Sequence, residues 1–108
     1  MAKNKKRADV APVEEALILE DERIEEPRKY VIILHNDDFT TQEFVVFILV
    51  NFLHKNHLDA HQLMLKVHKE GKARVGFFTK DIALSKVQSI TSFSRQNGMP
   101  LKVSAEPA

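Results

Sequence analysis

The chain has 108 residues, 44% of them hydrophobic, which is enough for one domain with a core. Its 16 Lys and Arg nearly balance its 15 Asp and Glu, and this net charge of +1 argues against a protein that binds nucleic acid mainly through charge. Because the chain has no cysteine, it can form no disulfide and no thiolate catalytic or zinc site. The absence of cysteine is compatible with the cytoplasm, where we expect the protein, but does not establish it.

Residues 1–28 predict a flexible N-terminal tail, and residues 29–108 predict a single folded domain. The tail holds six Lys and Arg, mostly at its start, and eight Asp and Glu, mostly behind them. It offers too little apolar surface to offset the entropy lost on ordering. Its basic start is not followed by the apolar region of a signal peptide.

The domain begins with a strand that leads into a helix. Residues 29–35 are mainly β-branched and apolar, which predicts a buried strand with His35 pointing away from the core. Residues 41–53 predict a helix that is apolar nearly all round and is therefore buried on more than one side. Its longest apolar run, 44–50, is far shorter than the roughly 20 residues that cross a bilayer, so we expect no membrane partner.

A second helix and a second strand follow. The helix should run from about residue 58 to 70, and the strand from 73 to 78. Simple alternation along this strand puts Ala73, Val75 and Phe77 on one face.

A third helix and a last strand complete the pattern. Thr79 is a suitable N-cap for the helix, which ends at Asn97 and Gly98. The last strand runs from Leu101 to about Ser104, and the final residues fray. The order β-α-α-β-α-β predicts an α+β fold, in which three helices pack on one face of a three-stranded antiparallel sheet.

An acidic turn connects the first strand to the first helix. Thr40 and Glu43 match the T-x-x-E capping box that opens a helix. In the simpler interpretation of this turn, the side chains of Asn36 and Asp38 accept hydrogen bonds from nearby backbone N–H groups. In the other interpretation these side chains bind a ligand at the edge of the core.

A ligand with a primary ammonium group would suit these side chains. An ammonium has three N–H donors and no acceptor, so it needs several converging acceptors. Asn36, Asp38 and a neutral His68 could supply them, while Met64, one helical turn before His68, would floor an apolar hole. An amine beside an apolar side chain is the signature of a peptide's first residue. His68 alone has a simpler explanation, because a histidine near a helix C-terminus favours the helix dipole.

Metal binding and catalysis are the alternatives. His57, His61 and His68 lie close to one helical stripe, but the chain has no HExxH motif and no obvious third ligand. A hydrolase could pair His68 with Asp37 or Asp38, yet no serine stands in the sequence context of a nucleophile. We therefore expect no enzyme activity and no cofactor, while a histidine metal site stays open as an alternative.

Four motifs, NDDFTTQEFV, HQLMLKVHKEGKA, GFFT and MPL, follow one another between residues 28 and 106. In this order they resemble the ClpS family, the adaptors that pass substrates to the Clp AAA+ unfoldase and protease. The resemblance implies a fold similar to the C-terminal domain of a ribosomal stalk protein. It also implies a monomer whose tail is engaged by the unfoldase during delivery.

The resemblance further implies recognition of N-degrons, substrates that begin with Leu, Phe, Tyr or Trp. Carried over by position, Asn36, Asp38 and His68 would hold the α-amino group, and Asp37 would support the turn or the unfoldase contact. The implied hydrophobic pocket is lined by Leu34, Gln42, Val45, Met64, Val67 and Leu101.

The implied partner is the N-terminal domain of a ClpA- or ClpC-type unfoldase, on which Asp81 and Lys86 would dock. Two positions depart from the family pattern: Gln42 replaces a frequent Met at the pocket rim, and Thr41 replaces a frequent Pro. Because Gln is polar, we expect a different discrimination against β-branched first residues. The rival to this function is a general protein-interaction module that uses the apolar surplus of the first helix.

Overall fold

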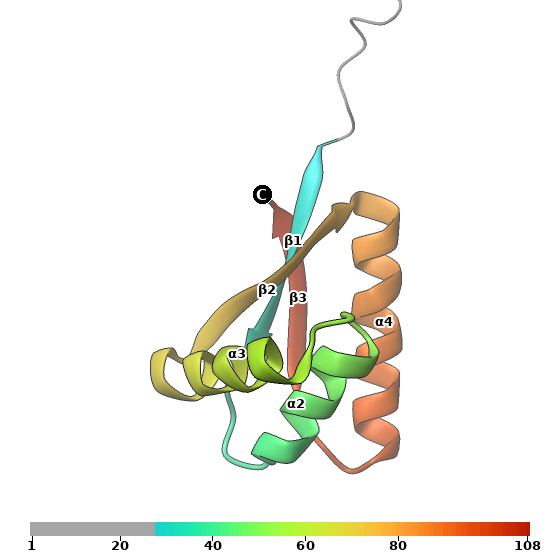
Figure 1. Cartoon of the computed structure of the whole chain (residues 1–108). Coiled ribbons are helices and arrows are strands. Elements are labelled where there is room, and N and C mark those ends of the chain that lie inside the picture. The colour runs from blue at the N-terminus through green and yellow to red at the C-terminus, as the bar shows by residue number, and fades with distance from the viewer. Residues whose placement is uncertain (1–27) are drawn as a thin grey trace, which may run out of the picture.

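The structure, a computed structural model, describes residues 28–108. The predicted tail therefore lies outside the described residues, except for Arg28. Three strands and three helices follow the predicted order β-α-α-β-α-β, which confirms the α+β fold (Figure 1). They are β1 (Lys29–His35), α2 (Gln42–Asn51), α3 (His57–Glu70), β2 (Lys72–Thr79), α4 (Lys80–Gln96) and β3 (Lys102–Pro107).

The strand β1 lies at the centre of an antiparallel sheet with the order β2-β1-β3. Its even-numbered side chains Ile32 and Leu34 are fully buried and belong to the hydrophobic core. Apolar side chains from all three helices, including Ile48, Met64 and Ile90, complete that core. The helices therefore cover one face of the sheet and leave the other face without a helix (Figure 1).

The prediction for β2 is wrong at Phe77, which is 56% exposed. Ile32 pairs with Gly76 but Ile33 pairs with Arg74, so Val75 is an extra residue in β2. Such a bulge shifts the alternation of side chains by one position. Residues after the bulge change faces, and Phe78 packs against the core in place of Phe77.

The first helix starts and is capped differently from the prediction. The N-cap of α2 is Thr41, whose Oγ1 accepts a hydrogen bond from the Phe44 backbone N–H at 3.1 Å. The predicted capping box of Thr40 and Glu43 is wrong, because the Thr40 hydroxyl instead donates to the Asp37 carboxylate at 2.7 Å. Thr40 therefore belongs to the turn and not to the helix.

The last strand is longer than predicted. It continues to Pro107, which pairs with Tyr30 near the start of β1. The backbone N–H of Ala108 also donates to the Lys29 carbonyl at 2.9 Å. Because these bonds hold the C-terminus beside the beginning of the central strand, the predicted fraying after Ser104 is wrong.

The helix α2 is buried on more than one side, as its apolar circumference predicted. Val45, Ile48 and Leu49 are buried. On another side, the ring centroids of Phe44 and Phe47 lie 5.8 and 5.6 Å from that of Phe93 on α4. These contacts join α2 to α4 and fix the position of the turn that precedes α2.

Candidate functional site

A cavity of about 290 Å³ lies between the β1–α2 turn and the helix α3. Ten residues line it: Asn36, Asp37, Asp38, Thr40, Thr41, Gln42, Val45, Met64, Val67 and His68. Eight of the predicted site residues are among these ten. The fold therefore brings together side chains from two segments, residues 36–45 and residues 64–68, that are apart in the sequence.

The turn is built by Asp37, and not by Asn36 and Asp38 as its simpler interpretation proposed. One oxygen of the Asp37 carboxylate accepts hydrogen bonds from the backbone N–H groups of Phe39 and Thr40, at 2.7 and 2.8 Å. The other oxygen accepts from the Thr40 hydroxyl. These three bonds use both carboxylate oxygens and fix the path of the chain between β1 and α2.

A backbone hydrogen bond ties this turn to the end of α3. The Asn36 N–H donates to the Gly71 carbonyl at 2.8 Å, and the Gly71 N–H donates to the Val67 carbonyl at 2.9 Å. Gly71 takes the left-handed conformation, φ 89°, that closes a helix. The C-terminal turn of α3, which carries His68, is thereby held beside the acidic turn.

Three polar side chains on the rim of the cavity are exposed and have no hydrogen-bond partner among the described residues. Within residues 28–108, no hydrogen bond engages the Asn36 amide, the Asp38 carboxylate or the His68 ring. All three residues are exposed. Their acceptor atoms can therefore bind a ligand without breaking a bond within the fold.

The inner wall of the cavity is apolar. It consists of Val45 from α2 and of Met64 and Val67 from α3, which are 2 to 6% exposed. The other two predicted pocket residues, Leu34 and Leu101, are not in this wall, because they lie in the core with exposed fractions of 0 and 1%. They support the wall from behind.

The sequence analysis did not predict two of the lining residues, Thr40 and Thr41, as part of the site. Their roles in the turn and the helix cap explain their position at the cavity, and the run of polar residues before α2 was the available signal. Gln42, the predicted rim residue, also lines a second hollow with Glu43, Val46, His61 and Met64.

The electrostatic environment of the cavity favours a cation. Two carboxylates, Asp37 and Asp38, line it, and no Lys or Arg does. The cavity also adjoins the C-terminal turn of α3, where the unpaired carbonyl groups carry the negative end of the helix dipole. A positively charged group would therefore be attracted by side chains and backbone together.

The two predicted docking residues are not at this cavity. Asp81 lines a separate hollow with Arg28, Tyr30, Thr79 and Lys80. The Lys86 ammonium donates to the Phe52 carbonyl at 2.9 Å and lies 5.4 Å from the centroid of the Phe78 ring. Both residues belong to the first half of α4, so the candidate docking surface is distinct from the cavity.

The histidines of α3 left a metal site open as an alternative. Residues 28–108 contain no group of three His, Asp or Glu side chains that could hold a metal ion. Over the same residues, no helix combines the length and the apolar character needed to cross a membrane.

Comparisons with known proteins agree with the resemblance. The sequence model of the family described as "ATP-dependent Clp protease adaptor protein ClpS" matches residues 25–104. A Myxococcus xanthus protein named ATP-dependent Clp protease adapter protein ClpS is 42% identical over 86 residues, which are 80% of each chain. A Paraburkholderia xenovorans protein of the same name is 42% identical over 89 residues, covering 82% of this chain and 86% of the relative.

The fold also matches a solved structure, that of Agrobacterium tumefaciens ClpS2 bound to L-phenylalaninamide. The TM-score is 0.74 at 31% sequence identity. The match covers 77% of this chain and all of the ClpS2 chain. The similarity thus extends over the elements that form the cavity.

Proposed function

This chain belongs to the ClpS family of Clp protease adaptors, and from that premise we propose that its cavity receives the first residue of a substrate protein. The chain is an adaptor and not an enzyme. Its task is therefore to bind a substrate and pass it on. The proposal concerns which feature of the substrate is bound, namely a free α-amino group followed by a bulky hydrophobic side chain.

The observation that carries this proposal is the combination of an unengaged polar rim with an apolar wall. Asn36 offers an amide oxygen, Asp38 a carboxylate and His68 a ring nitrogen, and no hydrogen bond within residues 28–108 uses these groups. An α-ammonium group can donate to three such acceptors. The adjoining side chain would then enter the space beside Val45 and Met64.

The energetics require both parts of the ligand. Burial of a Leu or Phe side chain contributes roughly 1.5–3 kcal/mol. Each hydrogen bond to a charged group contributes about 1.5–3 kcal/mol. Because association itself costs several kcal/mol, neither part suffices alone, and a dissociation constant on the order of micromolar is expected.

The ligand of the ClpS2 relative supports this proposal. That protein was solved with L-phenylalaninamide, a molecule that has a free amine next to an aromatic side chain. These are the two features that the cavity of the present chain can accommodate. All lining residues come from one chain, so we propose that a monomer is sufficient for binding.

For the partner, we propose the N-terminal domain of a ClpA- or ClpC-type unfoldase. The first half of α4 carries Asp81 and Lys86, and Ile82 between them is 49% exposed. An exposed apolar side chain flanked by charges is suited to protein docking. An adaptor of an ATP-dependent protease works where ATP is supplied, which leads us to expect the chain in the cytoplasm.

Titration with matched peptides tests the proposed function. Fluorescent peptides that begin with Leu or Phe should bind, whereas the same peptides with an acetylated α-amino group should lose at least about tenfold in affinity, the loss of one charged hydrogen bond. Peptides that begin with Gly serve as a control for the side chain. Equal binding of free and acetylated peptides would overturn the proposal and would favour a general protein-interaction module.

A further inference from the structure

The face of the sheet that the helices leave open is basic. The odd-numbered residues of β1 point toward it, as do Lys72 and Arg74 on β2 before the bulge and Lys102 on β3. We define the open face by its charged residues, which are Lys29, Lys72, Arg74, Lys102 and Glu106. Four positive charges thus face one negative charge.

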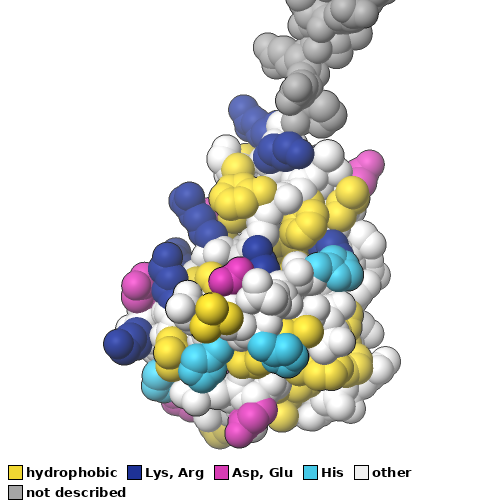
Figure 2. Space-filling view, in the orientation of Figure 1, with side chains coloured by type: hydrophobic (Ala, Val, Ile, Leu, Met, Phe, Trp, Pro, Cys, Tyr) yellow, Lys and Arg dark blue, Asp and Glu magenta, His cyan; other side chains and the backbone are white. Residues whose placement is uncertain are grey.

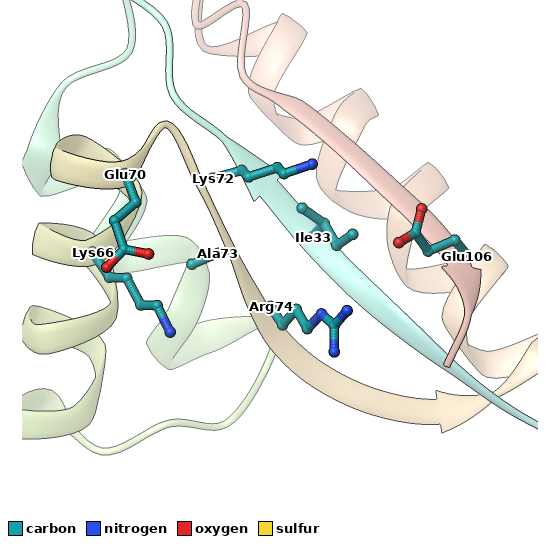
Figure 3. A pocket seen from close by; sticks show the side chains of 7 residues that line it. All are labelled: Ile33, Lys66, Glu70, Lys72, Ala73, Arg74 and Glu106. Carbon is teal, nitrogen blue, oxygen red and sulfur yellow. The ribbon is translucent and has the colours of Figure 1, made fainter.

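A hollow opens beside the edge strand β2 and extends from the open face to α3, which contributes Lys66 and Glu70 to its lining. Its volume is about 290 Å³, and Ile33 lies at its floor with Lys72, Arg74 and Glu106 around it. Figure 3 shows Lys72 and Arg74 extending from β2 across β1, on either side of Ile33. Phe77, which the bulge turns outward, adds an exposed apolar side chain to the same face.

The basic groups of this face are not used within the fold. Among residues 28–108, no hydrogen bond engages the side chain of Lys72, Arg74 or Lys102. Burial lowers the pKa of His35 on the same face, and the positive charges of Lys102 and Lys72 lower it further. The four positive charges against one negative charge make the local potential of this face positive. Figure 2 shows Lys and Arg side chains along the left side of the view, where β2 begins after α3 in Figure 1.

The chain contains a segment of opposite charge directly before β1. Between residues 14 and 26 the sequence has seven Asp and Glu and a single Arg. Apolar residues lie between these acidic residues, as one run from Ala16 to Leu19 and as Ile24. The segment thus offers carboxylates for the Lys and Arg of the open face and apolar side chains for Phe77 and Ile33.

The length of the chain allows this segment to reach the open face. Ile33 lies four residues beyond Lys29, about 13 Å along an extended strand. A segment of 13 residues can extend over roughly 40 Å. Even after a reversal of direction near Pro27, residues 14–26 can therefore pass over the face from Phe77 to Lys72.

We propose that residues 14–26 dock on the open face of the sheet as an intramolecular acidic segment. The short connection gives the segment an effective concentration in the millimolar range, so that a weak contact is occupied for much of the time. Salt should weaken the ion pairs between the carboxylates of this segment and the Lys and Arg of the open face, because such pairs would be exposed to solvent. This contact occupies the face opposite the helices, so it leaves the substrate cavity free, and it does not depend on the proposed function.

Paramagnetic relaxation enhancement can test the docking in the full chain. The sequence has no cysteine, so Leu19→Cys provides a single attachment site for a nitroxide label. The amide signals of Arg74 and Ser104 on the open face should broaden, and those of His61 and Gln62 on α3 should not. The enhancement should fall at least about threefold between 0.01 and 1 M salt, because the Debye length shrinks from about 30 to about 3 Å.

Charge reversal supplies the matched control. Lys72→Glu with Arg74→Glu should reduce the enhancement on the open face, whereas Lys55→Glu with Lys69→Glu changes the net charge equally and should leave it intact. Equal broadening on both faces, or broadening indifferent to salt and to both variants, would overturn the proposal. A mixture of an isotope-labelled chain without the nitroxide and an unlabelled chain that carries it detects docking between copies. Broadening in this mixture would also overturn the proposal, because the segment would then dock on a second copy.

Discussion

Two hollows of the same volume, about 290 Å³, lie at different places on the fold and differ in the charge of their lining. The cavity beside the helices is lined by two Asp residues and no Lys or Arg, over an apolar wall. The cavity beside β2 is lined by three basic residues, Lys66, Lys72 and Arg74, and by two acidic ones, Glu70 and Glu106, with Ile33 beneath them. Volume alone thus says nothing of the ligand, and the charge of the rim decides which group each hollow attracts.

The central strand supplies both hollows through its alternation. Ile32 and Leu34 point to the helices and support the core behind the substrate cavity. Val31, Ile33 and His35 point to the open face. After His35 the chain leaves the sheet and enters the acidic turn that lines the cavity beside α3. The seven residues of β1 therefore supply Ile33 to one cavity and lead directly into the rim of the other.

The largest effect is expected from removing a wall residue of the substrate cavity. Met64→Ala should lower the free energy of unfolding by about 2–5 kcal/mol, because Met64 is only 4% exposed. It should also weaken binding of Leu-starting peptides, since the enlarged cavity loses contacts with the side chain. Urea denaturation and peptide titration measure the two effects.

Ile33→Ala is the matched control for that variant. Ile33 is 5% exposed and lies under the open face, so its loss should cost a similar amount of stability without a change in peptide affinity. If both variants weakened peptide binding equally, the two hollows would not be functionally distinct.

A smaller effect is expected from a rim carboxylate. Asp38→Ala should weaken peptide binding by about 1.5–3 kcal/mol, or roughly 10- to 150-fold, because the α-ammonium loses a charged acceptor. The fold should keep its stability, since no hydrogen bond within residues 28–108 engages the Asp38 carboxylate. Glu106→Ala on the open face should leave binding unchanged, and an equal loss in that control would speak against a specific contact.

Most of this comparison could be predicted from the sequence, because periodicity and local motifs determine it. The order of elements and eight of the residues that line the cavity beside α3 follow from strand and helix patterns and from the family motifs. The positions of Leu34 and Leu101 behind the wall could not be predicted, because a motif names residues near a site without their depth. The bulge at Val75 could not be predicted either. Phe77 and Phe78 are both apolar, so the sequence pattern is the same whichever of the two rings faces the core.

The bulge gives the next prediction, since it determines which side chains of β2 reach each face. A Cβ atom at Gly76 would lie 2.7 Å from the Cε2 atom of Phe78, so Gly76→Ala must displace that ring. Because the Phe78 ring packs against the core, the substitution should cost about 1–3 kcal/mol of stability. In a Phe78→Leu background the cost should be smaller, which a double-mutant cycle measures. Additive losses would mean that the ring does not fill the space above Gly76.

The smallest expected effect concerns the pH dependence of the open face. Burial lowers the pKa of His35 from its ordinary value of 6.5, and Lys102 and Lys72 lower it further against the opposing effect of Glu106. The folded chain therefore binds this proton less readily than the unfolded chain does. Stability from His35 is complete above about pH 6.5 and is lost as the pH falls below that value.

A variant without this imidazole isolates the contribution. His35 Nε2 and Ser104 Oγ form a hydrogen bond of 2.8 Å, and His35→Gln keeps a polar side chain at this position. Urea denaturation at pH 7.5 and 5.5 should show a smaller loss of stability in the variant than in the original chain, because the other histidines are the same in both. An identical loss in both chains would mean that the lysines of the open face do not repel a proton at His35, and the positive potential on which the docking of residues 14–26 depends would lose its support.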